Sequence, residues 1–171
     1  LMLDRALGSR EIRVRYHRGK IELMSISVLH ESIKKLIAIF VEAFCMERLL
    51  DFIPWGSATQ RFSDVAAGEP DESYTIGQTR GERPDLVIEV LSPSTADRDQ
   101  VAKAKQYARF DVREMWIADP GAKSIEMLVN SEDGFRRATL HRGDDVLRSP
   151  PLPGLEIPLA DLFLMGTDKF D

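Results

Sequence analysis

The stretch RPDLVIEV, residues 83–90, constrains the fold more than any other part of the chain. Its branched aliphatic residues predict a β-strand, and successive side chains of a strand point to opposite faces. Asp85 and Glu89 therefore share one face with Val87, while the other face is wholly aliphatic. A strand this apolar belongs in a protein core, so its two carboxylates need an explanation.

The order of the predicted elements indicates the fold class. Apolar and charged residues alternate on either side of Gly19, which predicts an N-terminal β-hairpin within residues 11–27. Apolar residues at spacings of three and four then predict a long helix over residues 28–50. Further strands are expected at residues 73–76, 83–90, 114–120, 124–130 and 135–142, and a second helix at residues 100–110. This order predicts a mixed α/β (α+β) domain with one central sheet.

Composition limits the partners and the location of the protein. A length of 171 residues with 43% hydrophobic content suits a single domain over residues 1–171 with a sizeable core. The net charge of -5 gives no general attraction to nucleic acid or anionic membrane, so such a partner would need a local basic patch. Cys45 is the one cysteine, which excludes an internal disulfide and suits a reducing compartment. No apolar run is long enough to span a bilayer, and we expect a cytoplasmic protein.

Two acids on neighbouring predicted strands have the pattern of a metal site. Asp71 lies at the entry to the strand at residues 73–76, and a hairpin with the strand at residues 83–90 would place it beside Glu89. Paired carboxylates repel each other and are costly to bury unless a divalent cation or a shared proton offsets the cost. Oxygen ligands of this kind suit Mg²⁺ or Mn²⁺. Alternatively, each acid lies in solvent at a strand end or pairs with a nearby arginine, although Glu89 occupies the middle of an aliphatic run.

The second helix carries a lysine with two possible roles. Asp99, Lys103 and Tyr107 recur at intervals of four and share one helix face, and Val101 and Ala104 are assigned to the opposite, apolar face. Spacing alone favours a surface ion pair between Asp99 and Lys103, worth about 0.3 kcal/mol. In the other interpretation, the Lys103 ammonium reaches the acidic site and stabilises negative charge on a phosphate.

Glu31 follows His30 in the first turn of the long predicted helix. Acidic residues near a helix N-terminus are favoured by the helix dipole, so Glu31 needs no function to explain it. The same position would also let Glu31 contribute to a metal site at the edge of the sheet. The sequence leaves both roles open.

Several motifs in a fixed order carry a family resemblance. They are YHRGKIELMS and HESIKKLI, EPDESYTI, RPDLVIEVLSPST followed by DRDQVAKAKQYARFDVREMWIADP, and LPGLEIPLADLF. Together, over about residues 11–164, they resemble the Uma-two family of restriction-endonuclease-like proteins, a branch of the PD-(D/E)XK nuclease superfamily. The resemblance implies a restriction-endonuclease-like fold, in which helices flank a central mixed β-sheet, and a Mg²⁺-type phosphodiesterase site.

The resemblance also implies which residues are catalytic. Asp71 matches the first metal-binding aspartate of the family, and Glu89 matches the acid of the second half of the motif. The superfamily normally has a lysine two residues after that acid, but Leu91 stands there in this chain. The matching lysine is Lys103 on the following helix, as is typical of this family.

Three further residues are expected to support the site. Glu31 matches the acid that many superfamily members place on their first helix. Asp85 matches the second PD motif of the family, and Tyr107 lies one helical turn after the relocated lysine.

The residues and the resemblance together predict an endonuclease that uses Mg²⁺ or Mn²⁺ to hydrolyse phosphodiester bonds of nucleic acid, with DNA as the expected substrate. The displaced lysine leaves a second function open, that of a catalytically inactive nuclease fold that binds nucleic acid or a protein partner. A homodimer is expected, because a small domain that cuts duplex DNA needs a second site for the second strand.

Overall fold

The computed structural model describes residues 11–17, 20–26, 28–63, 66–77, 83–92 and 97–167. Within these residues, six strands form a central sheet in the order β10-β9-β8-β7-β6-β3. Their bounds are β3 Phe52–Pro54, β6 Glu72–Ile76, β7 Leu86–Val90, β8 Glu114–Asp119, β9 Ser124–Ser131 and β10 Gly134–Arg142. Only the β7–β8 pair in this described sheet is parallel, and its other neighbouring strands are antiparallel. The predicted mixed α/β class with a central sheet is confirmed.

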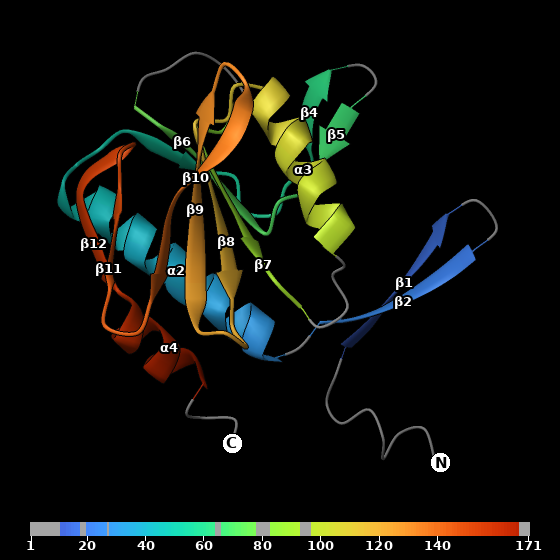
Figure 1. Cartoon of the computed structure of the whole chain (residues 1–171), viewed down its shortest axis with the longest axis horizontal. Coiled ribbons are helices and arrows are strands. Elements are labelled where there is room, and N and C mark those ends of the chain that lie inside the picture. The colour runs from blue at the N-terminus through green and yellow to red at the C-terminus, as the bar shows by residue number, and fades with distance from the viewer. Residues whose placement is uncertain are drawn as a thin grey trace.

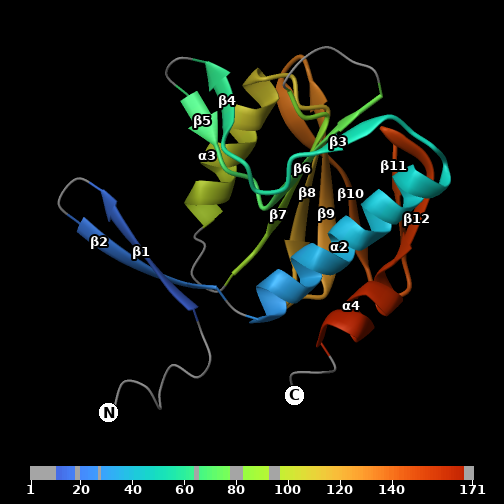
Figure 2. The ribbon, with the colours of Figure 1, turned by 180° about the vertical axis from the view of Figure 1, so that it is seen from behind.

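Helices cover both faces of the sheet. Figures 1 and 2 show α2 (Val28–Glu47) across one face and α3 (Asp97–Arg109) against the other. Ile33, Ile37 and Val41 form a stripe at intervals of four along α2, and this stripe packs in one cluster with Leu86 and Ile88 of β7. Burying each of these aliphatic side chains contributes about 1.5–3 kcal/mol, so this stripe fixes the helix on the sheet.

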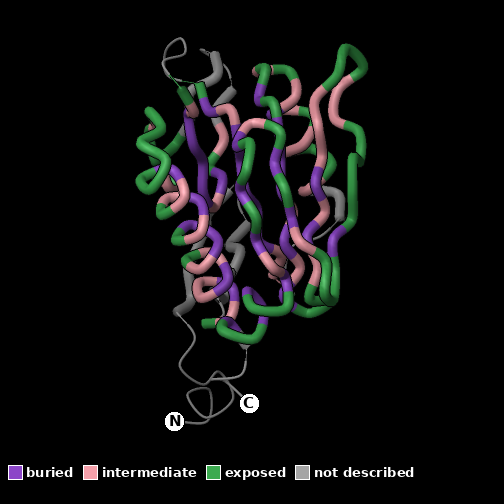
Figure 3. Tube along the Cα trace, turned by 90° about the vertical axis from the view of Figure 1, so that its left-hand side faces the viewer, coloured by how far each residue is buried: buried purple, intermediate pink, exposed green. Residues whose placement is uncertain are grey.

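The strand β7 occupies the middle of the sheet, as its composition predicts. All five of its residues are buried, and Figure 3 shows buried residues concentrated along the central strands. The face opposite α2 belongs to a second cluster, in which Val87 packs with Tyr107 and Met115. The helix α3 connects β7 to its parallel neighbour β8, which is the crossover that a parallel pair requires.

The other described elements surround this centre. The predicted N-terminal hairpin is confirmed as β1 (Glu11–His17) paired antiparallel with β2 (Lys20–Ile26), and it projects from the body in Figures 1 and 2. Its turn at Gly19 lies outside the described residues. Two further antiparallel pairs are β4 (Gln60–Ser63) with β5 (Ala66–Gly68), and β11 (Val146–Ser149) with β12 (Leu152–Pro158). The last helix, α4 (Leu159–Thr167), packs against α2, and its Leu162 and Phe163 belong to the same core cluster as the apolar stripe of α2.

The predicted long helix is confirmed, although it ends earlier than expected. It stops at Glu47 and not at residue 50, and Leu49 adopts a left-handed backbone with a φ of 51° that a continuing helix does not allow. None of the helices in the described ranges combines the length and the apolar character that crossing a lipid bilayer requires.

Glu114 is a buried carboxyl group at the start of β8, opposite Leu86 and thus at the far end of β7 from Glu89. Its Oε1 accepts hydrogen bonds from Ser149 Oγ, at 2.7 Å, and from Trp116 Nε1. Its Oε2 has no hydrogen-bond partner in the part of the chain that the structure describes. Burial raises the pKa of Glu114, although the two hydrogen bonds act in the opposite direction.

We expect this group to make the folded protein less stable as the pH rises. The folded pKa of Glu114 lies above the unfolded value of about 4.3, so its contribution is complete below that pH and is lost as the pH rises through the folded pKa. Glu114→Gln removes this titration, because the amide cannot ionise and keeps an acceptor oxygen. In denaturant unfolding between about pH 4 and 8, the stability of the variant relative to wild type should therefore increase with pH, by about 1.4 kcal/mol if the folded and unfolded pKa values differ by one. A difference that stays constant over this range would contradict the prediction.

Candidate active site

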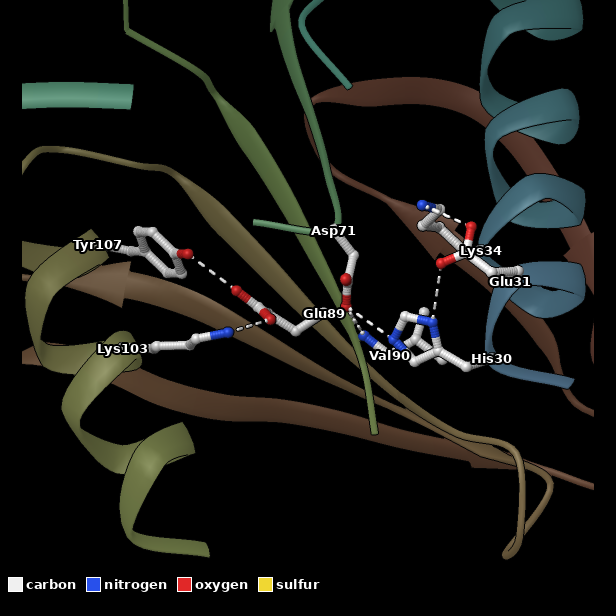
Figure 4. A network of polar contacts seen from close by, with 8 residues as sticks. All are labelled: His30, Glu31, Lys34, Asp71, Glu89, Val90, Lys103 and Tyr107. Carbon is white, nitrogen blue, oxygen red and sulfur yellow. Dashed lines mark hydrogen bonds and ion pairs between the residues drawn. The ribbon is translucent and has the colours of Figure 1, made fainter. Parts of the chain in front are cut away.

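The pairing of β6 with β7 brings two predicted site residues together. The two strands are antiparallel, with Glu72 opposite Ile88, so Asp71, one residue before β6, lies beside Glu89. The Oδ2 atom of Asp71 accepts a hydrogen bond of 2.8 Å from the backbone N–H of Val90. Figure 4 shows the two carboxylates side by side at this end of β7. The hairpin predicted between these strands is confirmed.

Glu89 is the most buried acid of this group, with only 2% of its side chain exposed. Two residues of α3 hold its carboxylate: Lys103 Nζ donates to Oε2 at 2.7 Å and Tyr107 Oη donates to Oε1 at 2.8 Å. Burial raises the pKa of Glu89, the charge of Lys103 lowers it, and the neighbouring Asp71 raises it further. The ammonium of Lys103 thus compensates a carboxylate that would otherwise be costly to bury.

Asp71 is more accessible, with 26% of its side chain exposed, and its environment favours the ionised form. Burial alone would raise the pKa of Asp71, but the hydrogen bonds from His30 and from the N–H of Val90 bring it below its ordinary value. His30 Nε2 lies 3.3 Å from Asp71 Oδ2. Burial opposes the charged form of His30, yet its contacts with Asp71 and Glu31 raise the pKa of the imidazole.

The first turns of α2 extend the network away from the sheet. Glu31 Oε1 lies 3.4 Å from His30 Nδ1, and Lys34 Nζ lies 2.8 Å from Glu31 Oε2. In the described contacts, Glu31 is linked to Asp71 through His30, as Figure 4 shows. Burial would raise the pKa of Glu31, but Lys34 and His30 lower it. Glu31 therefore lies at the edge of the site, next to His30. The sequence patterns predicted no role for this histidine.

Asp85 lies apart from these residues. It precedes β7, and four residues of strand separate it from Glu89 by roughly 13 Å. Its Oδ2 accepts a hydrogen bond of 2.8 Å from the N–H of Ile76, and its Oδ1 lies 3.5 Å from Arg113 Nε. The structure therefore does not bring Asp85 to the other acids, and its contacts fix the far end of the β6–β7 hairpin.

The face assignment of α3 is corrected by the structure. Val101 is 55% exposed, whereas Ala104 packs beside Tyr107 in the buried cluster, so the expected apolar face is wrong. The helix packs through the face that carries Lys103 and Tyr107, because Glu89 provides a polar partner under it. Lys103 contacts the buried carboxylate of Glu89, which is the second of the two roles considered for it. The side chain of Asp99, the surface partner that spacing favoured, lies outside the described residues.

The donor atoms present fit a divalent ion that keeps most of its water ligands. No three His, Cys, Asp or Glu side chains in the described ranges lie close enough to form a complete protein cage. Asp71 and Glu89 offer two neighbouring carboxylates, and the described hydrogen bond and ion pair of Asp71 both involve Oδ2 and not Oδ1. Mg²⁺ and similar ions bind through one or two carboxylates and retain several waters, which matches this pair.

Comparisons with known proteins identify the family and the fold of the chain. A family model described as "Putative restriction endonuclease", Uma2, matches residues 3–160. None of the curated proteins matches the chain. A crystal structure described as a putative nuclease belonging to DUF820 from Anabaena variabilis superposes with a TM-score of 0.71 and 18% identity, over 90% of each chain. At this identity the likeness shows the fold alone, and that fold is the restriction-endonuclease-like one expected from the sequence. Because the family model covers most of its length, the chain belongs to the Uma2 family of restriction-endonuclease-like proteins.

Proposed function

We propose that this protein is an endonuclease that hydrolyses phosphodiester bonds of DNA with the help of Mg²⁺ or Mn²⁺. The observation that carries the proposal is the 2.7 Å contact between Lys103 Nζ and Glu89 Oε2, beside the carboxylate of Asp71. It gives the acidic pair the lysine that Leu91 does not provide. A relocated lysine that reaches the acids favours an enzyme over an inactive binding protein.

Each side chain of the site has its own role in the proposed hydrolysis. Asp71 and Glu89 would hold the ion, which when bound supplies an activated water and neutralises charge on the phosphate. The side chain of Lys103 is 28% exposed, so its ammonium can contact a phosphate while it remains paired with Glu89, and there it stabilises negative charge. Tyr107 acts as a positioning residue, because its hydroxyl fixes Oε1 of Glu89. His30 orients Asp71 and favours its ionised form.

The proposal includes the partners and the location of the enzyme. Two copies would cut the two strands of a duplex, so we expect a homodimer. The single cysteine, Cys45, is buried and free, which suits the reducing conditions of the cytoplasm. The net charge of -5 implies that DNA is bound through local contacts at the site, so affinity should fall with added salt less steeply than for a strongly basic protein.

A cleavage assay with substitutions at matched aspartates tests this function. Wild type should cut DNA with Mg²⁺ or Mn²⁺ and should be inactive in EDTA. Asp71→Asn is expected to lower the cleavage rate by about 10²- to 10³-fold, since a catalytic metal contributes several kcal/mol. Asp111→Asn is the control, because Asp111 is exposed beyond the C-terminal end of α3 and asparagine tolerates its φ of 59°. Cleavage in EDTA, or cleavage of RNA alone, would refute the proposal as stated.

A further inference from the structure

Gln100 presents a buried polar group that the proposed chemistry does not use. Both polar atoms of its amide, Oε1 and Nε2, are buried and have no hydrogen-bond partner among the described residues. Most buried side-chain polar atoms in proteins are paired, because an unpaired buried amide loses its bonds to water and gains none in return. A side chain with both a donor and an acceptor unpaired is therefore suited to a ligand that offers both.

Helix geometry places Gln100 beside the candidate active site. It lies three residues before Lys103 and seven before Tyr107, so it shares the face of α3 that contacts Glu89. The chain leaves β7 at Val90 and enters α3 at Asp97, so the first turns of α3 lie toward the end of β7 that contacts Asp71. Gln100 is about 4.5 Å further along the helix axis than Lys103, in that direction.

The chemistry of the amide distinguishes between parts of a nucleotide. A phosphate only accepts hydrogen bonds, so it would pair with Nε2 and leave Oε1 unpaired. The edge of a base can offer an acceptor and a donor side by side, which pairs with both amide atoms. In the major groove of duplex DNA, adenine alone presents this combination, through N7 and the N6 amino group.

We propose that Gln100 is a specificity-determining residue: its side chain, which is partly exposed as a whole, turns its amide out of the buried position to bind the edge of an adenine next to the phosphate that is cut. This inference rests on the proposed nuclease function and deepens it, because it assigns a base preference to the same site. It also gives a role to a glutamine whose amide has no partner among the described residues.

The test compares wild type with Gln100→Leu on four duplexes that differ only in the base next to the mapped cut. Wild type should favour adenine by roughly tenfold or more in kcat/KM. Gln100→Leu should cut all four duplexes with equal kcat/KM, through a higher KM on the adenine duplex and a kcat close to wild type. Its midpoint of denaturant unfolding should be no lower than that of wild type, because leucine removes the unpaired amide. Gln106→Leu changes the other glutamine of α3, which lies about 120° around the helix from Gln100, and should keep the adenine preference.

A second measurement needs no substitution in the protein. Replacing adenine with 7-deazaadenine removes the N7 acceptor, so it should reduce kcat/KM of wild type and leave that of Gln100→Leu unchanged. An equal loss on all four duplexes or a lower stability of Gln100→Leu would overturn the inference, because the amide would then have another partner. A preference for adenine that Gln100→Leu retains would overturn it as well, because another group would then recognise the base. If wild type cuts DNA without a preference that depends on Gln100, only this inference fails. If wild type cuts no DNA, the proposed function fails with it.

Discussion

Replacing Lys103 with methionine is expected to lower the rate of DNA cleavage by about 10²- to 10³-fold, the loss typical of removing one preorganised group that stabilises developing charge. Methionine keeps an unbranched apolar stem and removes the ammonium that lies 2.7 Å from Glu89. Single-turnover cleavage at saturating metal measures the effect, and circular dichroism checks the fold. Lys105→Met is the matched control, because Lys105 is exposed on the same helix and should be dispensable.

The position of the lysine can be tested in the same experiment. Leu91 is two residues after Glu89 and so lies on the same side of the extended chain, where the superfamily normally has its lysine. Adding Leu91→Lys to Lys103→Met should restore part of the lost cleavage, because the new ammonium can approach the same carboxylate. If Lys103→Met cuts DNA as fast as wild type, the relocated lysine has no catalytic role and the proposed mechanism is wrong.

Glu89→Gln should have the largest effect of any single substitution. Glutamine has the same shape, so the variant loses a metal ligand and the charge that holds Lys103 while the strand β7 keeps its packing. We expect Mn²⁺ affinity, measured by calorimetry, to fall at least about tenfold, as metal sites do when even an outer partner is removed. The cleavage rate should fall by about 10³-fold or more.

Glu114→Gln provides the matched control for this variant. Glu114 is an equally buried glutamate of the same sheet, but it contacts Trp116 and Ser149 at the other end of β7. Its amide variant should bind Mn²⁺ and cut DNA as wild type does. A similar loss in both variants would mean that burying an amide in this sheet, and not the loss of a metal ligand, causes the defect.

The elements that recur in a regular pattern could be predicted from the sequence. The alternation in RPDLVIEV correctly predicted the two faces of β7, with Leu86 and Ile88 toward α2 and Val87 toward α3. The hairpin that places Asp71 beside Glu89 also followed from local patterns, because strand periodicity and the turn formers between the strands are properties of short segments. The family resemblance implied that Lys103 is the catalytic lysine.

The contacts that depend on packing between distant segments could not be predicted in this way. Spacing along one helix favoured a local partner for Lys103, whereas its partner Glu89 comes from another element. Neither the helix pattern nor the HESIKKLI motif predicts a role for His30, and its contact with Asp71 arises because the first turn of α2 lies beside the start of β6. Asp85 shares a face with Glu89, but strand geometry alone separates the two by roughly 13 Å, so the shared face did not mean a shared site.

The most direct test of the proposed site is cleavage of supercoiled plasmid DNA by wild type and by Glu89→Gln, at equal protein concentration in the same Mn²⁺ buffer. The site described above predicts nicked and linear DNA with wild type, none of either with Glu89→Gln, and none with wild type once EDTA is added. Cleavage that survives Glu89→Gln unchanged would contradict a site built on Asp71, Glu89 and Lys103.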